Sequence, residues 1–107
     1  MEVGYINTQF KKGVLELCVL SILREQDHYG YNLVKEISSK FPVTEGTIYP
    51  LLRRLTAEEY VTTYLVESEQ GPARKYYTLT EKGSIYRDEL ALEWKQLVDI
   101  IRYFNVD

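Results

Sequence analysis

Residues 44–55 read TEGTIYPLLRRL, and this stretch decides the fold. Thr44 carries the hydroxyl of an N-cap, and Glu45 places a carboxylate in the first turn, where it complements the helix dipole. Apolar residues then recur at i, i+3, i+4 and i+7, which predicts a helix with one core-facing stripe. The stripe consists of Ile48, Leu51, Leu52 and Leu55. The opposite face carries Gly46, Tyr49, Pro50 and Arg53, so we expect the functional contacts of the protein on that face.

Pro50 lies inside this predicted helix. A proline within a helix removes one hydrogen bond and clashes with the preceding turn, at about 3 kcal/mol. Either the helix begins later, near Tyr49, or its first turn is irregular and the Gly46 carbonyl faces solvent or a ligand. We favour the irregular first turn.

Two further helices are predicted on the N-terminal side. Apolar residues cover most of the helix circumference over 12–24, which indicates a helix buried on nearly all sides. Residues 27–30 then predict a break, and an amphipathic helix follows that ends near Lys40. Pro42 stops it, because the residue before a proline disfavours helical backbone.

The pattern changes to period two on the C-terminal side. Residues 61–66 and 75–79 are β-forming and flank the turn cluster 69–73, which predicts an antiparallel hairpin. Thr80 caps a final helix that runs to about Asn105, roughly 38 Å at about 1.5 Å per residue.

The final helix carries a heptad seam. Its apolar positions alternate at four- and three-residue spacing: Leu90, Trp94, Leu97, Ile101 and Phe104. Three short helices and one hairpin can hardly cover so long a helix, so we expect a second copy of the chain to cover it. We therefore divide the chain into an N-terminal part, 1–80, and a dimerisation helix, 81–107.

This order of elements describes an α+β, mainly α, winged helix-turn-helix with three helices, a two-stranded wing and a long C-terminal helix. Three strings are more specific than the order: YGYNL at 29–33, TEGTIYPLLRRL at 44–55 and GPARKYYTLTEKG at 71–83. Together they resemble the signature of the PadR family of bacterial transcriptional regulators, over about 12–83. The single helix after them resembles the short-tailed subfamily.

The resemblance implies a homodimer that binds a near-palindromic operator in double-stranded DNA, and we expect it in the cytoplasm because nothing resembles a signal peptide or a membrane span. It also implies a repressor that a small aromatic or amphipathic effector releases. The family pattern tolerates a proline at position 50. Glu45 departs from it, because the family often has an uncharged residue there. A carboxylate would repel phosphates, although it could accept a hydrogen bond from cytosine N4.

The third helix is expected to enter the major groove with its N-terminal residues near base edges. The predicted DNA-binding residues in that helix are Thr44, Gly46, Thr47, Tyr49, Pro50, Arg53 and Arg54. Those in the wing are Gln70, Gly71, Arg74 and Lys75, and those at the starts of the other two helices are Tyr29, Gly30 and Lys12.

Structural alternatives stand beside these roles. Thr47 would then only reinforce the cap, and Tyr49 would pack on the wing. Gly30 would serve only the turn, with Tyr31 in the core. The hairpin and Lys12 would then be ordinary solvated surface groups without a DNA contact. The formal net charge of −3 also weighs mildly against DNA, although 46–55 and 70–80 contain bases and no acid.

A second site is predicted around Trp94, which lies in the middle of the heptad seam. Its ring could stack a planar effector, with apolar walls from Leu90, Leu97, Val14 and Leu17. The favoured alternative is that Trp94 only fills the dimer interface, where aromatic residues are enriched.

Several function classes lack support in the sequence. One cysteine, Cys18, and one histidine, His28, cannot make a zinc site or a catalytic dyad, so we expect no metal, no cofactor and no enzyme. The Cys18 thiol lies in an apolar stripe and is expected to be inert. Nothing resembles a signal peptide or a membrane span. The alternative function is a winged-helix module that binds protein instead of DNA.

Overall fold

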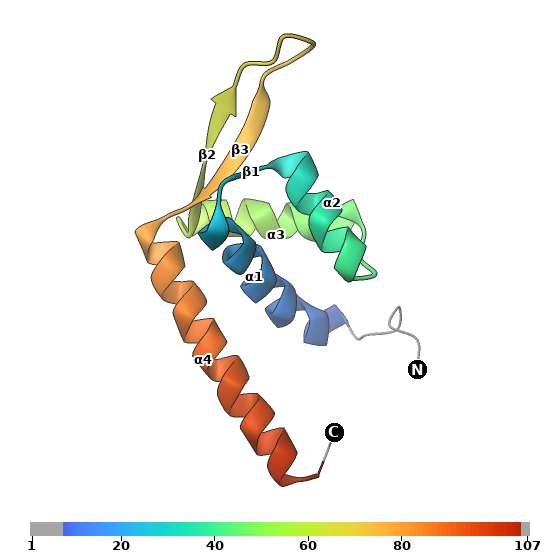
Figure 1. The fold of residues 1–107 in the computed structure, drawn as a ribbon, viewed down its shortest axis with the longest axis vertical. Coiled ribbons are helices and arrows are strands. Elements are labelled where there is room, and N and C mark those ends of the chain that lie inside the picture. Colours follow the sequence, from blue (N-terminus) through green and yellow to red (C-terminus); the bar gives the residue numbers. More distant parts are fainter. Residues whose placement is uncertain (1–7, 106–107) are drawn as a thin grey trace.

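The computed structural model describes residues 8–105 and confirms the predicted fold class. Four helices and a small antiparallel sheet follow one another along the chain (Figure 1). In order they are α1 (Thr8–Glu25), β1 (His28–Tyr29), α2 (Gly30–Lys40), α3 (Glu45–Ala57), β2 (Val61–Val66), β3 (Arg74–Leu79) and α4 (Glu81–Tyr103). The hairpin of β2 and β3 projects from one end as the wing, and α4 extends towards the other.

The sheet has three strands, where the sequence predicted two. The segment expected to be only a break contains β1, which pairs antiparallel with β3 and gives the strand order β1-β3-β2. His28 is opposite Tyr77, and Tyr29 is opposite Tyr76. Two residues are too few to show a periodicity, so this strand is defined only by its tertiary pairing.

The core lies where α1, α2 and α3 pack together and against the base of the sheet. Its buried apolar residues confirm the predicted stripes of α2 (Leu33, Val34, Ile37) and α3 (Ile48, Leu51, Leu52, Leu55), and Val61 and Tyr77 join them from the sheet. Helix α1 was expected to be buried on nearly all sides over 12–24, but among its apolar residues there only Leu15, Val19, Leu20 and Leu23 are buried, and the others are half-buried. Burying one such side chain contributes about 1.5–3 kcal/mol. This core fixes α3 relative to the wing.

Helix α3 begins before Pro50, as the favoured explanation requires. It starts at Glu45 and continues through the proline, whose missing N–H leaves the Gly46 carbonyl without its usual intrahelical partner. Thr44 is the N-cap residue, but its hydroxyl makes no capping bond; its carbonyl accepts hydrogen bonds from the N–H groups of Thr47 and Ile48. The capping role predicted for the Thr44 side chain is therefore wrong.

Helix α4 runs antiparallel to α1. Polar contacts join their facing sides: Arg24 bonds the Ser84 hydroxyl and forms an ion pair with Asp88 at 2.7 Å, and Arg87 bonds the Ser21 hydroxyl at 2.9 Å. The N-cap of α4 is as predicted, since the Gly83 N–H donates to the Thr80 hydroxyl at 2.9 Å. Within residues 8–105, no helix is long and apolar enough to cross a bilayer.

Candidate nucleic-acid interface

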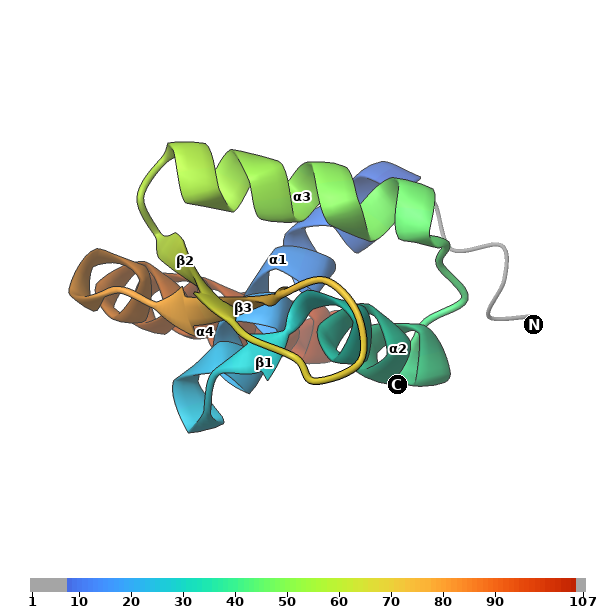
Figure 2. The same cartoon turned by 90° about the horizontal axis from the view of Figure 1, so that it is seen from above.

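A shallow pocket lies where α3, the start of α2 and the wing meet. Seen from above the wing, α3 lies on one side of the strands and β1 with α2 on the other (Figure 2). The pocket is lined by Tyr29, Gly30, Tyr31, Tyr49, Arg53, Lys75 and Tyr77. It brings together five predicted contact residues from three separate stretches of the chain. Its lining offers two cationic groups and several phenols, which suits an anionic, hydrogen-bonding partner.

A row of tyrosines supports the cationic residue at the start of β3. The rings of Tyr64, Tyr76 and Tyr29 lie next to one another across the three strands, with centroid separations of 5.6 and 6.0 Å. The Arg74 guanidinium stacks over the Tyr29 ring at 5.0 Å. Cation–π contacts of this kind contribute about 0.5–1 kcal/mol at exposed sites. The row thus orients Arg74 before any partner binds.

The start of α2 approaches the sheet closely because Gly30 has no side chain. A Cβ at Gly30 would lie 3.1 Å from Cε1 of Tyr77, closer than ordinary packing allows. Burial raises the pKa of Tyr77, and burial together with the nearby Glu45 raises the pKa of Tyr49, so both phenols stay protonated donors at neutral pH. Tyr31 is 54% exposed, so the alternative that placed it in the core is wrong.

The predicted residues of α3 divide between two environments. Thr44, Gly46, Thr47, Pro50 and Arg53 are exposed, and Tyr49 is half-buried against the wing. Arg54 instead faces α1: its guanidinium bonds Glu16 at 2.8 Å and Glu58 at 3.1 Å. The structure therefore separates Arg54 from Arg53, and we leave Arg54 out of the DNA-contact set.

The remaining predicted residues lie at the extremes of the molecule. Gln70 and Gly71 are exposed near the tip of the wing, where Gly71 has φ of +120°, a backbone conformation that favours glycine. Lys12 is exposed on α1, whose N-terminal end lies far from the wing tip (Figure 1). The structure does not bring Lys12 to the pocket.

Sequence reasoning missed the wing tyrosines as part of this surface. Tyr64, Tyr76 and Tyr77 were used only as strand-forming residues. The period of two contained the signal, because adjacent residues of a strand point to opposite faces. Tyr77 packs inwards on the core, whereas Tyr76 joins the row with Arg74 on the other face.

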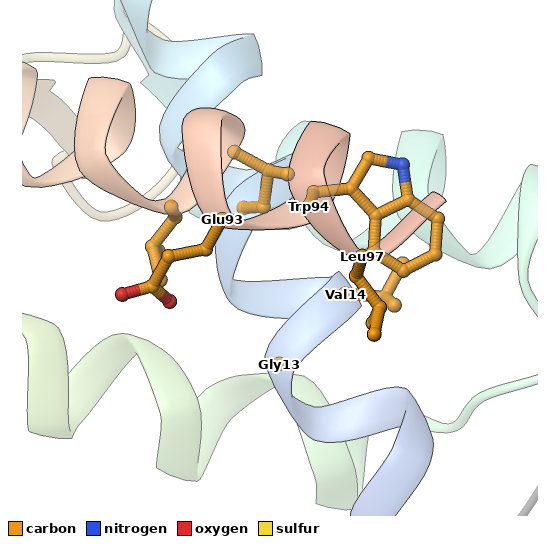
Figure 3. Close-up of a pocket in the computed structure, with 7 residues that line it drawn as sticks. Gly13, Val14, Glu93, Trp94 and Leu97 are labelled. Atoms are coloured by element: carbon orange, nitrogen blue, oxygen red, sulfur yellow. The ribbon is translucent and has the colours of Figure 1, made fainter. Parts of the chain in front are cut away.

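A second pocket lies between α1 and α4, and the five residues predicted to form an effector site all line it. The lining comprises Gly13, Val14, Leu17, Leu90, Glu93, Trp94 and Leu97. The Trp94 ring lies beside Leu97 and Val14, and the Glu93 carboxylate points away from it (Figure 3). Trp94 and Leu97 are 41% and 43% exposed, so this wall of the pocket is open to solvent.

Other chemistry has little basis in the described part of the chain. Residues 8–105 hold no group of three or more His, Cys, Asp or Glu side chains arranged to bind a metal ion. Cys18 is half-buried away from both pockets, and burial raises the pKa of its thiol. A thiol with a raised pKa is a poor nucleophile, which agrees with the inert role predicted for it.

Comparisons with known proteins agree with this geometry. The sequence profile of the transcriptional regulator PadR-like family matches residues 19–89. The transcriptional regulator YqjI of Escherichia coli K12 is 33% identical over 84 residues, which cover 75% of this chain but only 39% of YqjI.

Solved structures extend the similarity over nearly the whole chain. A PadR-like transcription factor from Bacteroides fragilis has 38% identity and a TM-score of 0.77, covering 90% of this chain and 94% of its own. A PadR-like transcriptional regulator from Bacillus cereus has 37% identity and a TM-score of 0.80, covering 92% and 98%.

Proposed function

This chain belongs to the PadR-like family of transcriptional regulators, and from that premise we propose that it is a homodimeric repressor that binds a near-palindromic operator in double-stranded DNA. The observation that carries the proposal is the shared surface of α3 and the wing, where Arg53, Lys75 and the exposed start of α3 lie together. Transcriptional regulators are not enzymes, and we propose no catalysis. An operator lies on the chromosome, so we place the protein in the cytoplasm.

Helix α3 would lie in the major groove. Thr47 and Tyr49 would donate hydrogen bonds to bases or phosphates, and Arg53 would bond guanine or clamp a phosphate. Gly46 and the flat Pro50 ring permit close approach of the helix. The α3 segment and the wing would supply local positive charge although the whole chain is acidic.

The wing would hold the flanking DNA. Arg74, oriented by the tyrosine row, and Lys75 would contact phosphates or enter the minor groove, where the negative potential attracts arginine. Gln70 and Gly71 at the tip would follow the backbone. Tyr29 and the first N–H groups of α2 at Gly30 would hold one phosphate.

Dimerisation would set the spacing of the two DNA-binding surfaces, with 1–80 as the DNA-binding part and 81–107 as the dimerisation helix. The predicted seam is compatible with this role: its residues Trp94, Leu97 and Phe104 are exposed, and Leu90 and Ile101 are half-buried. Ile85, Leu92, Ile100 and Tyr103 are also exposed, off the seam. A partner chain would bury the seam, and the two α3 helices would then meet half-sites about one helical turn apart, roughly 34 Å.

We propose the α1–α4 pocket as the effector site. Its apolar lining and the exposed Trp94 ring suit a planar aromatic molecule. Quenching of Trp94 fluorescence during a screen of phenolic and cationic compounds tests this role. If no compound quenches it, Trp94 serves only as packing in the dimer.

Fluorescence anisotropy tests DNA binding. The probe is a labelled duplex from the protein's own promoter, and wild-type affinity should fall steeply with salt as counterions are released. Substituting Arg53→Ala together with Arg74→Ala should weaken specific binding by about 100-fold or more, at about 1–3 kcal/mol per contact. The matched control, Lys95→Ala with Arg102→Ala, removes the same charge from α4 and should change affinity by less than about threefold.

Unchanged affinity in the Arg53 and Arg74 double variant would reject the DNA-binding assignment. Weak, salt-independent association with DNA together with a co-purifying protein would instead support the protein-binding alternative.

A further inference from the structure

A buried carboxylate in the middle of α1 joins three helices. Glu16 is only 7% exposed, and its Oε1 atom accepts hydrogen bonds from the Arg54 guanidinium at 2.8 Å and from the Tyr86 hydroxyl at 3.0 Å. Arg54 belongs to α3 and Tyr86 to α4. One oxygen atom therefore fixes the orientation of both helices relative to α1.

Stability alone is a poor reason for this arrangement. Removing a carboxylate from water costs several kcal/mol, and apolar side chains of similar volume often stabilise a helix junction at least as well. What the charged group adds is geometry, since its two donors must reach the same atom. Arg54 also has an exposed partner, Glu58, one turn along α3, which could keep its charge paired without Glu16.

The first turns of α4 are fastened to the end of α3. The Tyr86 ring stacks on Tyr60 at a centroid separation of 4.1 Å, and Tyr60 lies in the short turn between α3 and β2. The Thr80 N–H donates to the Tyr60 carbonyl at 3.2 Å, and the Lys82 ammonium donates to the Glu58 carbonyl at 2.8 Å. If α4 moves relative to α1, these contacts would therefore move the end of α3 as well.

The carboxylate and its two bonding partners are near neighbours in sequence of residues that line the two pockets. Glu16 is next to Leu17, which lines the α1–α4 pocket, and Tyr86 is one helical turn before Leu90, which lines the same pocket. On the other side, Arg54 is next to Arg53 of the DNA-facing pocket. Glu16 lines neither pocket itself; it belongs to α1 and bonds one residue of α3 and one of α4.

We propose that Glu16 is a positioning residue that couples the α1–α4 pocket to helix α3. When the spacing of α1 and α4 at the pocket changes, the bond from Tyr86 to Glu16 changes with it. The paired Arg54 then follows, and with it the angle at which α3 meets the duplex. This inference rests on the proposed DNA binding by α3.

Trp94 provides the test, because it is the single tryptophan of the chain and lines the pocket. Its emission reports the pocket, while anisotropy of a labelled duplex reports binding. The duplex is one that the wild-type protein selects from a random-sequence library. The variants are Tyr86→Phe, which keeps the stacked ring, and Glu16→Gln. Their control is Glu58→Gln, which removes the same charge from the other partner of Arg54.

At saturating duplex, the Trp94 emission should shift in the wild type and in Glu58→Gln. The shift should fall about threefold or more in Tyr86→Phe and in Glu16→Gln, although anisotropy still shows binding. Their preference for the selected duplex over a scrambled one should also fall by about fivefold or more. If Glu16 had a purely structural role, its loss would lower the unfolding midpoint but would change neither the Trp94 emission shift nor the duplex preference of the folded protein.

An equal emission shift in all four proteins overturns the proposal, and so does wild-type binding without any shift, while DNA binding then stands. If the wild-type protein binds none of the duplexes recovered from the library, both the Glu16 proposal and the proposed DNA binding are overturned. If circular dichroism shows that Glu16→Gln is unfolded, Tyr86→Phe decides alone, because it loses only one hydroxyl and keeps the stacked ring.

Discussion

Substituting Gly83→Ala should strongly destabilise the protein, against the usual effect of this change in a helix. Gly83 lies in the first turn of α4 and is buried. A Cβ built there would lie 1.9 Å from the Tyr60 carbonyl oxygen and 2.8 Å from Cδ1 of Leu79. Real Cβ atoms do not approach a backbone oxygen so closely, so the start of α4 would have to move.

The size of the effect follows from two opposing contributions. Alanine in place of glycine gains about 1 kcal/mol of helix propensity. Forcing a methyl group into a packed site costs about 1–3 kcal/mol, and displacing α4 would also weaken the Thr80 cap, worth about 1 kcal/mol. We therefore expect a net loss of about 2 kcal/mol, because the clash involves backbone and cannot be relieved by a rotamer change.

Urea unfolding followed by far-UV circular dichroism, at one fixed protein concentration, measures this loss. Gly46→Ala is the control, since its added Cβ would meet only the Thr44 hydroxyl at 3.5 Å, an ordinary contact. That variant should be neutral or more stable by up to about 1 kcal/mol. If Gly83→Ala were as stable as the wild type, the close approach of α4 to Tyr60 would be refuted.

Three further predictions follow from single contacts. Burial and then the bond to Glu16 raise the pKa of Tyr86 to about 12, above the ordinary value near 10. Between these pH values the unfolded chain loses the phenol proton while the folded protein keeps it, so folding stability should fall as pH rises. Urea unfolding midpoints measure this fall, which should be smaller in Tyr86→Phe. Leu97→Glu should give a monomer by light scattering at micromolar concentration, whereas Leu92→Glu, also exposed on α4 but off the seam, should leave a dimer. Thr80→Ala should lower unfolding free energy by about 1 kcal/mol, and Thr80→Ser should largely restore it.

Local patterns were sufficient for most of the fold. The apolar spacing in 44–55 gave the buried face of α3, and the period of two around the turn at 69–73 gave the wing. Both signals reflect the fixed geometry of one element, so they need no knowledge of its neighbours. The residues that line the α1–α4 pocket were also predictable, because the heptad seam and the apolar face of α1 had to be covered by other side chains.

The candidate site was predictable only in part. Arg53 and Arg54 are adjacent in sequence and chemically identical, yet Arg53 lines the pocket between α3 and the wing, and Arg54 bonds a buried glutamate. Their positions on the helix differ by about 100°, and only the packing of α1 and α4 decides which direction is solvent.

The sequence by itself determined the order and type of the long elements and the family to which the chain belongs, because periodicity, caps and turn residues act within a few residues of one another. Tertiary structure decided the strand β1, the tyrosine row beneath Arg74 and the junction at Glu16. Each of these joins groups far apart in the chain. The free energy of such contacts depends on distance in space, which no local pattern specifies.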